Sequence, residues 1–163
     1  MSQIWKFGAD VDTDQIVPGR YAPYMRPNED VGDAAFIEAR PDFNKQAVPG
    51  DIIVATDNFG CGSSREYAPY ALRRRQVGAI FANSFARIFY RNAVNLGIPV
   101  FTDEALVQKL IDGNEAEFNL EAGTILIDGE THQLPEVPNF AKEIIDAGGI
   151  VPYVREYGRF PNS

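Results

Sequence analysis

The sequence predicts an α/β fold with a parallel βαβ core and an additional β-meander, and three observations support this prediction. Between residues 51 and 113, short apolar segments alternate with segments of helical periodicity, which is typical of parallel strands joined by right-handed crossovers. From residue 117 to 134, strand-like segments are separated by short turns, which indicates antiparallel strands. At 163 residues the chain suits one core, so we expect a single domain over residues 1–163.

The first third of the chain begins with a strand and continues mainly as a loop. Residues 3–7 alternate like a strand and stop at a glycine. Residues 20–32 contain two prolines, two tyrosines and two arginines without a sustained period, so an irregular loop is expected. A short helix is expected over residues 34–39, closed by Arg40 and Pro41.

The chain is organised around residues 58–66, Asn-Phe-Gly-Cys-Gly-Ser-Ser-Arg-Glu, which follow an apolar, β-branched strand over residues 51–55. Ser63 and Glu66 fit the S-x-x-E capping box, so Ser63 is the expected N-cap of a helix that runs to about Arg75. This arrangement would place backbone N–H groups and the positive helix end beside two hydroxyls and a guanidinium, forming an anion site.

The second half of the chain continues the same alternation and then changes character. The core is expected to add a strand over 78–82, a helix over 85–96 capped by Asn83 or Ser84 and ended by Gly97, a strand over 98–101, and a helix over 104–111 capped by Asp103. On the second of these helices, Arg87 and Arg91 form an i,i+4 pair on a face of their own. The rest is expected to comprise meander strands over 117–120, 124–127 and 131–134, a helix over 139–147, and a last strand over 150–154.

Composition and charge exclude several classes of protein. Hydrophobic residues make up 45% of the sequence and no apolar stretch reaches 18 residues, so we expect a soluble protein with no membrane partner. No secretory signal is visible, which makes the cytoplasm the expected compartment. The net charge of −8 argues against nucleic acid. The run from Arg73 to Arg75 is interpreted as favourable charge at a helix C-terminus.

Metal chemistry within this chain alone is also unfavourable. One cysteine, Cys61, and one histidine, His132, cannot supply a disulfide or a metal or iron–sulfur site. Asp10, Asp12 and Asp14 have the spacing of a calcium loop, but the glycine and the glutamate that such a loop needs are absent. The three carboxylates are interpreted either as an Asx-turn or as functional groups, and their spacing does not choose between the two.

The glycine-rich motif itself allows both a structural and a functional interpretation. Taken alone, it is compatible with a well-capped helix; it is neither G-x-S-x-G nor a P-loop. The functional interpretation makes Ser63 a base next to Arg65, which can hold a carboxylate through two hydrogen bonds. A helix N-terminus contributes at most about 2 kcal/mol, or roughly 1.5 pK units, too little to ionise a serine hydroxyl. Other groups must help, including Arg65, backbone donors and a bound metal or cofactor that this chain cannot ligate, so the sequence indicates half of an active site.

Three motifs follow one another along the chain: Val11-Asp12-Thr13-Asp14 with Pro18-Gly19-Arg20-Tyr21, Phe59 to Glu66 with Ala68-Pro69, and Ser84-Phe85-Ala86-Arg87-Ile88 with Arg91-Asn92. In these motifs and in their order, the chain resembles the small subunit of 3-isopropylmalate dehydratase and its relatives in the aconitase superfamily. The resemblance runs from about residue 4 to 154. This resemblance implies a swivelling β/β/α domain that closes over a large subunit carrying a [4Fe-4S] cluster. The pair would remove and re-add water on a 2-hydroxy acid.

The resemblance also implies roles for individual residues. By position, Ser63 is similar to the alkoxide base that removes the carbon-bound proton, and Arg65 to its carboxylate-binding neighbour. Ser64 would support the substrate carboxylate, and Asp14 would orient active-site groups. Tyr67 stands where many relatives have histidine, a departure that leaves the proposed base and its arginine unchanged.

Substrate choice in this superfamily resides in the loop after the Thr-Asp motif. Homoaconitase-like subunits tend to place an arginine shortly after the tyrosine, to bind an extra carboxylate. Here Tyr21, Pro23 and Tyr24 make this stretch apolar, which favours an alkyl group such as isopropyl and a role in leucine biosynthesis. Arg26 complicates this interpretation, because a flexible loop could bring it to the substrate. Homoaconitase and 2,3-dimethylmalate dehydratase therefore stay open.

Two further functions compete with a hydro-lyase subunit. A non-catalytic binding module could have kept the anion site, and it would show neither an iron–sulfur partner nor dehydratase activity. A stand-alone hydrolase would need activity in the isolated chain, which the scarcity of His and Cys disfavours. A homo-oligomer of the isolated chain also stays open.

Overall fold

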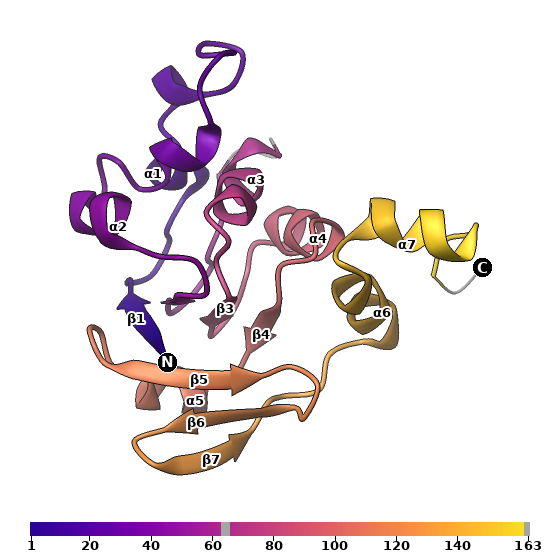
Figure 1. Ribbon diagram of the computed structural model, residues 1–163. Coiled ribbons are helices and arrows are strands. Elements are labelled where there is room, and N and C mark those ends of the chain that lie inside the picture. Colours follow the sequence, from indigo (N-terminus) through magenta and orange to yellow (C-terminus); the bar gives the residue numbers. More distant parts are fainter. Residues whose placement is uncertain (63–65, 162–163) are drawn as a thin grey trace.

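A computed structural model describes residues 1–62 and 66–161 of the chain. The strands form one sheet in the order β4-β3-β2-β1-β5-β6-β7. They are β1 (Ser2–Lys6), β2 (Ile52–Val54), β3 (Ala79–Ala82), β4 (Val100–Thr102), β5 (Glu115–Asn119), β6 (Thr124–Ile127) and β7 (Glu130–Gln133). Neighbours among β1 to β4 are parallel, whereas β5, β6 and β7 are antiparallel. The predicted parallel core and meander are thus confirmed, and Figure 1 shows the meander lying across the end of the parallel strands.

The parallel strands are buried on both faces, which explains their unbroken apolar sequences. Successive side chains point to opposite faces, so Ile53 and Ile80 enter one hydrophobic cluster while Ile52 and Phe81 enter the other. The register pairs Ile53 with Ile80, so that like-facing side chains stack. Each face of the sheet therefore has its own core.

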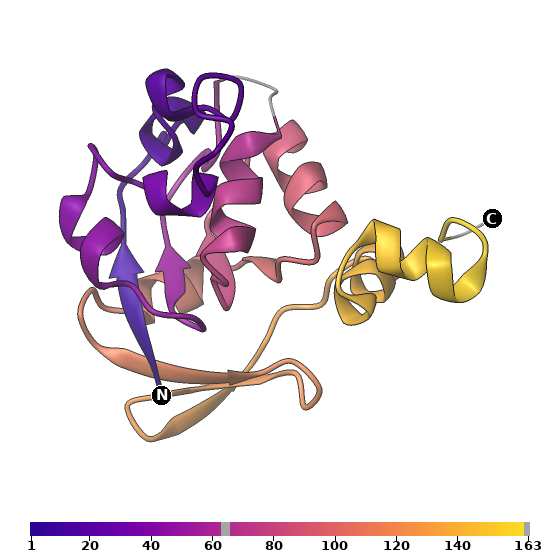
Figure 2. The same ribbon diagram turned by 45° about the horizontal axis from the view of Figure 1, so that its top comes forward.

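The helices differ in which face of the sheet they cover. They are α1 (Thr13–Ile16), α2 (Pro41–Gln46), α3 (Tyr67–Arg74), α4 (Arg87–Asn95), α5 (Glu104–Lys109), α6 (Asn139–Ala147) and α7 (Ile150–Tyr157), with 3-10 turns η1 (Gly19–Tyr21) and η2 (Val31–Ala34). Residues of α2, α3 and α4 contribute to one core, whereas α5 contributes to the other. Figures 1 and 2 show α6 and α7 extending from the side of α4.

Residues 150–154 form the start of α7, so the predicted last strand is wrong. Ile150, Val151 and Val154 are β-branched and suggested a strand, but Tyr153 is the residue that packs inward, at helical spacing from Ile150. Pro152 lies in the first turn, where its missing N–H is tolerated. Packing against the neighbouring helices has overridden local propensity.

The predicted helix over 34–39 is also wrong, because helix α2 begins where that prediction ended. Residues 35–39 are turns, and Pro41 occupies the first position of α2, with Arg40 as its N-cap residue. Proline suits this position, since its fixed φ is pre-organised for a helix start. Pro41 therefore begins a helix rather than closing one.

Two predicted helix caps do not hold. Helix α3 begins at Tyr67, with Glu66 at the N-cap rather than three residues into the helix, while Ser63 lies outside the described residues. The reason is Pro69, which is tolerated only in the first turn. Helix α4 begins at Arg87 after Ala86, so neither Asn83 nor Ser84 caps it. By contrast, Asp103 caps α5 through the Leu106 N–H at 3.0 Å, as predicted.

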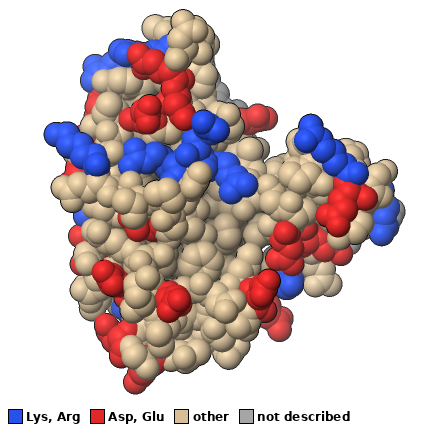
Figure 3. Space-filling model, viewed as in Figure 1, with Lys and Arg blue, Asp and Glu red and all other residues tan. Residues whose placement is uncertain are grey.

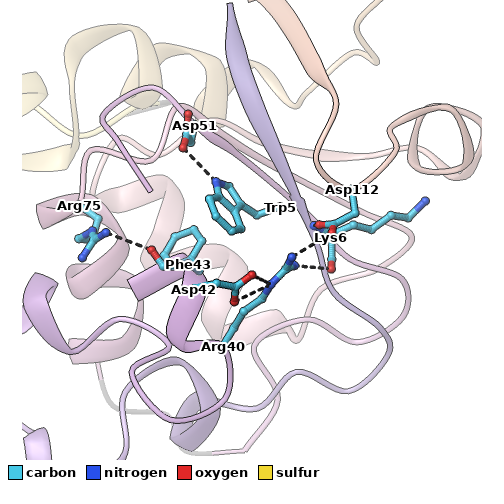
Figure 4. A network of polar contacts seen from close by, with 8 residues as sticks. All are labelled: Trp5, Lys6, Arg40, Asp42, Phe43, Asp51, Arg75 and Asp112. Atoms are coloured by element: carbon cyan, nitrogen blue, oxygen red, sulfur yellow. Dashed lines mark hydrogen bonds and ion pairs between the residues drawn. The ribbon is translucent and has the colours of Figure 1, made fainter. Parts of the chain in front are cut away.

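Two arginines tie the segment from residue 30 to 47 to the rest of the molecule, Arg40 to β1 and Arg75 to the end of α3 (Figure 4). Arg40 donates to the carbonyl oxygen of Lys6 at 2.8 Å and to Asp112 at 2.9 Å. Arg75 donates to the carbonyl oxygens of Asn44 and Ala47, both at 3.0 Å, near the C-terminal end of α2. These bonds fix the position of the segment that follows the loop over residues 20–32.

A buried carboxylate holds the start of β2 beside β1 (Figure 4). Asp51 is only 3% exposed. It accepts hydrogen bonds from the Trp5 indole N–H at 2.9 Å and from the backbone N–H groups of Gln3 and Val48. A buried carboxylate is tolerated only with such partners, so Asp51 fixes the strand start that leads to the glycine-rich motif.

Candidate functional site

Three segments far apart in sequence meet at the carboxyl ends of β1, β2 and β3. Residues 10–14 follow β1, residues 58–62 follow β2, and residues 84–87 follow β3, and these strands are neighbours in the sheet. In open parallel sheets, ligands bind at this end of the strands. The topology thus brings the three sequence motifs to one edge, with the glycine-rich segment in the middle.

Backbone hydrogen bonds join the middle segment to both of its neighbours. The Thr13 N–H donates to the carbonyl oxygen of Cys61 at 2.8 Å, and the Gly60 N–H donates to that of Val11 at 2.7 Å. On the other side, the Ala86 N–H donates to the carbonyl oxygen of Phe59 at 2.9 Å. These bonds depend on main-chain atoms, so they set the positions of the segments whatever the side chains are.

The glycines of the motif are required by backbone conformation and close packing. Gly60 has φ +86° and Gly62 has φ +102°, a region that side-chain-bearing residues rarely adopt. A Cβ atom on Gly60 would overlap the ring of Phe89, and one on Gly62 would lie 3.2 Å from Thr13 Oγ1. The rings of Phe59 and Phe89 pack edge to face at 5.2 Å, which fixes α4 against the motif.

Ser84 and Asn58 add a side-chain contact that the sequence did not predict. Ser84 Oγ accepts a hydrogen bond from the Asn58 N–H at 2.8 Å, which occupies the hydroxyl that was expected to cap α4. Asn58 has φ +61°, and its side-chain amide donates to Asp10 at 3.1 Å. An Asn shortly after a strand was the signal for such a left-handed residue, because Asn adopts this conformation more readily than most side-chain-bearing residues.

In the acidic cluster, Asp10 and Asp12 accept hydrogen bonds that support the local backbone, and Asp14 is the third carboxylate. Asp12 caps α1, accepting from the Gln15 N–H at 2.8 Å, while the Gln15 side chain accepts from the Asp12 N–H at 3.0 Å. This is a capping box, so the local interpretation is confirmed for Asp12. Asp14 is exposed in the first turn of α1. The Thr13–Cys61 bond holds that turn beside the start of the glycine-rich motif.

The predicted base and its neighbours are the part of the site that the structure leaves undescribed. Ser63, Ser64 and Arg65 lie outside the described residues, between Gly62 and Glu66. Cys61 lies just before them and is half-buried. Burial, with the charges of Asp10 and Asp12, raises the pKa of the Cys61 thiol, which keeps it protonated and a poor nucleophile.

The predicted substrate loop is held by contacts within itself. Tyr21 and Pro23 are both half-buried, whereas Tyr24 is 63% exposed. The Arg26 guanidinium stacks over the Tyr21 ring at 4.7 Å, donates to the carbonyl oxygen of Arg20 at 3.2 Å and pairs with Glu29 at 3.4 Å. In this arrangement Arg26 is engaged inside its own loop.

The arginine run at the end of α3 has structural partners, in line with the interpretation as favourable charge near a helix end. Arg74 pairs with Asp30 at 2.8 Å, and its hydrogen bond lowers the pKa of that carboxyl. Arg75 holds α2, as described above. Figure 3 shows a band of basic side chains across the face formed by α2 and α3.

The residues present do not fit an iron–sulfur cluster. Within residues 1–62 and 66–161, no three His, Cys, Asp or Glu side chains come together as a metal site would require. The whole sequence has one cysteine, whereas clusters are usually held by four thiolates.

No helix in the described part of the chain is long and apolar enough to cross a membrane.

Comparisons with known proteins agree with the geometry. The model of the family "Aconitase C-terminal domain" matches residues 10–103, which include all three motif segments. The chain is 47% identical to the isopropylmalate/citramalate isomerase small subunit of Methanocaldococcus jannaschii, covering 94% of this chain and 92% of the relative. It is also 47% identical to the homoaconitase small subunit of Thermus thermophilus, covering 99% of each chain.

A solved structure has the same fold. The crystal structure of 3-isopropylmalate dehydratase from Methanocaldococcus jannaschii matches with a TM-score of 0.84 and 37% sequence identity, covering 96% of this chain and 93% of that chain. The 3-isopropylmalate dehydratase small subunit of Methanosarcina acetivorans is 47% identical and is covered over 94% of its length. The chain therefore belongs to the aconitase C-terminal domain family, among the small subunits of the isopropylmalate dehydratase and homoaconitase type.

Proposed function

We propose that this chain is the small subunit of a cytoplasmic hydro-lyase that interconverts 2-isopropylmalate and 3-isopropylmalate in leucine biosynthesis. In this proposal it acts only with a large subunit that carries a [4Fe-4S] cluster. The observation that supports it most strongly is the backbone junction of residues 10–14, 58–62 and 84–87, because these segments hold the motifs on which the family resemblance rests.

In the proposed mechanism, this chain supplies the groups that act on the substrate's carbon skeleton. Ser63 removes the carbon-bound proton, Arg65 and Ser64 bind the adjacent carboxylate, and Asp14 orients these groups. Support comes from the placement of Asp14, since α1 is bonded to Cys61, two residues before Ser63. The partner's cluster would supply Lewis-acid activation of the substrate hydroxyl.

The two-subunit requirement follows from electrostatics. A serine hydroxyl ionises far above neutral pH, whereas a helix end contributes at most about 2 kcal/mol. Closing the site against a partner would remove water and strengthen every charge interaction at the base. The isolated chain is therefore expected to have no dehydratase activity.

The substrate assignment depends on the loop that carries Tyr21 and Arg26. Tyr21 and Pro23 offer an apolar surface, and Arg26 is occupied by Tyr21 and Glu29, so an alkyl substituent suits the loop better than a further carboxylate. Overall identity does not choose the substrate, because relatives named for isopropylmalate, citramalate and homoaconitate all have 47% identity.

A homoaconitase subunit is the second candidate. The Arg26–Glu29 pair is long, at 3.4 Å, and exposed. Such pairs contribute only about 0–1 kcal/mol, so a substrate carboxylate could displace Glu29 without a large cost. A 2,3-dimethylmalate dehydratase, whose substrate is apolar like isopropylmalate, is the third.

The test is to reconstitute this chain with its large iron–sulfur subunit and compare turnover of isopropylmalate, homocitrate, citrate and 2,3-dimethylmalate. We expect the highest kcat/KM with isopropylmalate and no turnover with Ser63→Ala, which should still assemble. A preference for a tricarboxylate would overturn the substrate assignment. Near-normal activity of Ser63→Ala would remove Ser63 as the base, and the lack of any association would favour a non-catalytic module.

A further inference from the structure

Two arginines on α4 differ from most other arginines in having no hydrogen-bond or ion-pair partner among the described residues. Arg87 and Arg91 lie one turn apart on the exposed side of the helix, opposite the buried Phe89. Among the described residues, neither forms an ion pair or a hydrogen bond. Arg40 and Arg74, by contrast, each pair with a carboxylate. Because acidic residues outnumber basic ones by 23 to 15, two arginines without a carboxylate are notable.

These arginines line a small hollow between α4 and the start of α6. Its volume is about 220 Å³, and it is lined by Arg87, Tyr90, Arg91, Val94, Asn95 and Phe140. Pockets for small organic ligands usually measure about 300–1,000 Å³, so this one suits a single side chain. Burial raises the pKa of Tyr90, which keeps its hydroxyl neutral. Two arginines together with the apolar side chains of Val94 and Phe140 match a carboxylate on an aliphatic stem.

The surface around the hollow has the composition of a protein interface. Ile88 is 51% exposed and Phe140 is 42% exposed, although both are large hydrophobic side chains. Interfaces combine such residues with arginine, and they are depleted in lysine and in acidic groups. The surface thus offers apolar contact area and charge together.

The helix that lines the hollow, α4, begins next to the candidate active site. Helix α4 begins immediately after Ala86, whose N–H donates to the carbonyl oxygen of Phe59 in the glycine-rich segment. Arg91 lies about 6 Å further along the helix axis than Arg87. A partner that closes over the motif would therefore reach the first turns of α4.

We propose that the hollow between Arg87 and Arg91 receives an aspartate or glutamate side chain of the large subunit when the two subunits assemble. This inference rests on the proposed function, since it requires that partner. Its carboxylate would accept hydrogen bonds from both guanidinium groups, and its stem would pack on Val94 and Phe140. Ile88 and Phe140 would be covered in the same contact.

The test measures the dissociation constant of the complete small–large complex for a charge-reversed double variant, Arg87→Glu with Arg91→Glu. We expect affinity to fall by about 100-fold or more, because a desolvated charge pair would become a repulsion. Wild-type affinity should decrease as salt is raised, and this dependence should be weaker in the neutral variant Arg87→Gln with Arg91→Gln. The matched control is Arg73→Glu. Arg73 is an exposed arginine in the last turn of α3, and its reversal should change affinity by less than about threefold.

Each outcome decides one question. A double variant that binds like the wild type, with dehydratase activity intact, would overturn the inference and leave the proposed function standing. If the double variant binds the large subunit with unchanged affinity but has a lower kcat at saturating large subunit, the hollow is a substrate site. If only self-association of the small subunit changes, the hollow is a contact between copies of this chain. Both results contradict the proposal. If the wild type itself binds no large subunit, the proposed function and this inference fall together. Circular dichroism of each variant checks its fold.

Discussion

The junction of three backbone segments and the neighbouring loop over residues 20–29 are held in different ways. The junction relies on main-chain hydrogen bonds between residues 10–14, 58–62 and 84–87. The loop relies on side chains, with Arg20 paired to Glu38 and Arg26 to Glu29, all of them substantially exposed. Such exposed pairs contribute only about 0–1 kcal/mol each. The junction can therefore keep its geometry when the side chains of the loop change.

The largest loss of stability is expected from a substitution in the junction at Gly60, which packs against Phe89. Gly60→Ala would combine a left-handed backbone, at about 1–2 kcal/mol, with overpacking against Phe89, at about 1–3 kcal/mol. We expect a loss of about 3 kcal/mol in the free energy of unfolding, measured by urea denaturation. Gly123→Ala is the matched control, since Gly123 also has positive φ but faces open space. Equal losses in the two variants would show that contact with Phe89 contributes nothing.

Two aspartates within one short helix should separate stability from catalysis. Asp12→Ala removes the N-cap of α1 and should cost about 1 kcal/mol of stability. Asp14→Ala should change stability by less than about 0.5 kcal/mol but lower kcat of the reconstituted enzyme by about 100-fold, through lost orientation. Thermal unfolding and steady-state kinetics of both variants give the comparison. An Asp14→Ala enzyme with full activity would contradict the proposed role.

A smaller effect is expected at the base of the loop, and it should depend on pH. The hydrogen bond from Arg40 lowers the pKa of Asp112. The pair therefore stabilises the fold above the unfolded pKa of about 3.9, and this contribution is lost as pH falls through the lower folded pKa. Asp112→Asn should lower stability by at most about 1 kcal/mol at pH 7, with the gap closing in acid. A gap that persists at pH 2 would point to packing instead.

The smallest effect on stability is expected at the loop itself. Arg26→Ala should leave the free energy of unfolding within about 0.5 kcal/mol of the wild type, because its ion pair is exposed. Turnover of isopropylmalate should be retained within a few-fold, since Arg26 is proposed to stay within its loop. Arg26→Lys serves as the control for charge alone. A selective loss of tricarboxylate turnover in Arg26→Ala would support the homoaconitase alternative.

Local patterns in the sequence sufficed for the sheet but not for every helix. The alternation of apolar strands and periodic helices predicted β2, β3, β4 and the meander, because burial on both faces leaves a clear signal. Residues 150–154 were assigned wrongly since their β-branched side chains pack on neighbouring helices, a tertiary effect. Pro41 and Pro69 held information on helix starts that the predictions over 34–39 and from Ser63 did not use.

At the candidate site, local sequence patterns predicted even less, because the site depends on contacts between distant segments. Spacing could suggest an Asx-turn at the acidic cluster, but it could not bring residue 13 beside residue 61, since that contact depends on strand order. Neither could it pair the Ser84 hydroxyl with Asn58. The family resemblance, rather than spacing, assigned Asp14 and Arg65 to one site, and their roles stay predictions.

The protonated thiol of Cys61 has a consequence for how such an enzyme would lose activity on exposure to oxygen. Oxidants attack thiolates, so the raised pKa protects this cysteine even though it stands two residues before the proposed base, Ser63. A partner's iron–sulfur cluster would have no such protection. Activity lost on exposure to oxygen should then return when fresh large subunit is added to the old small subunit, whereas fresh small subunit should restore nothing.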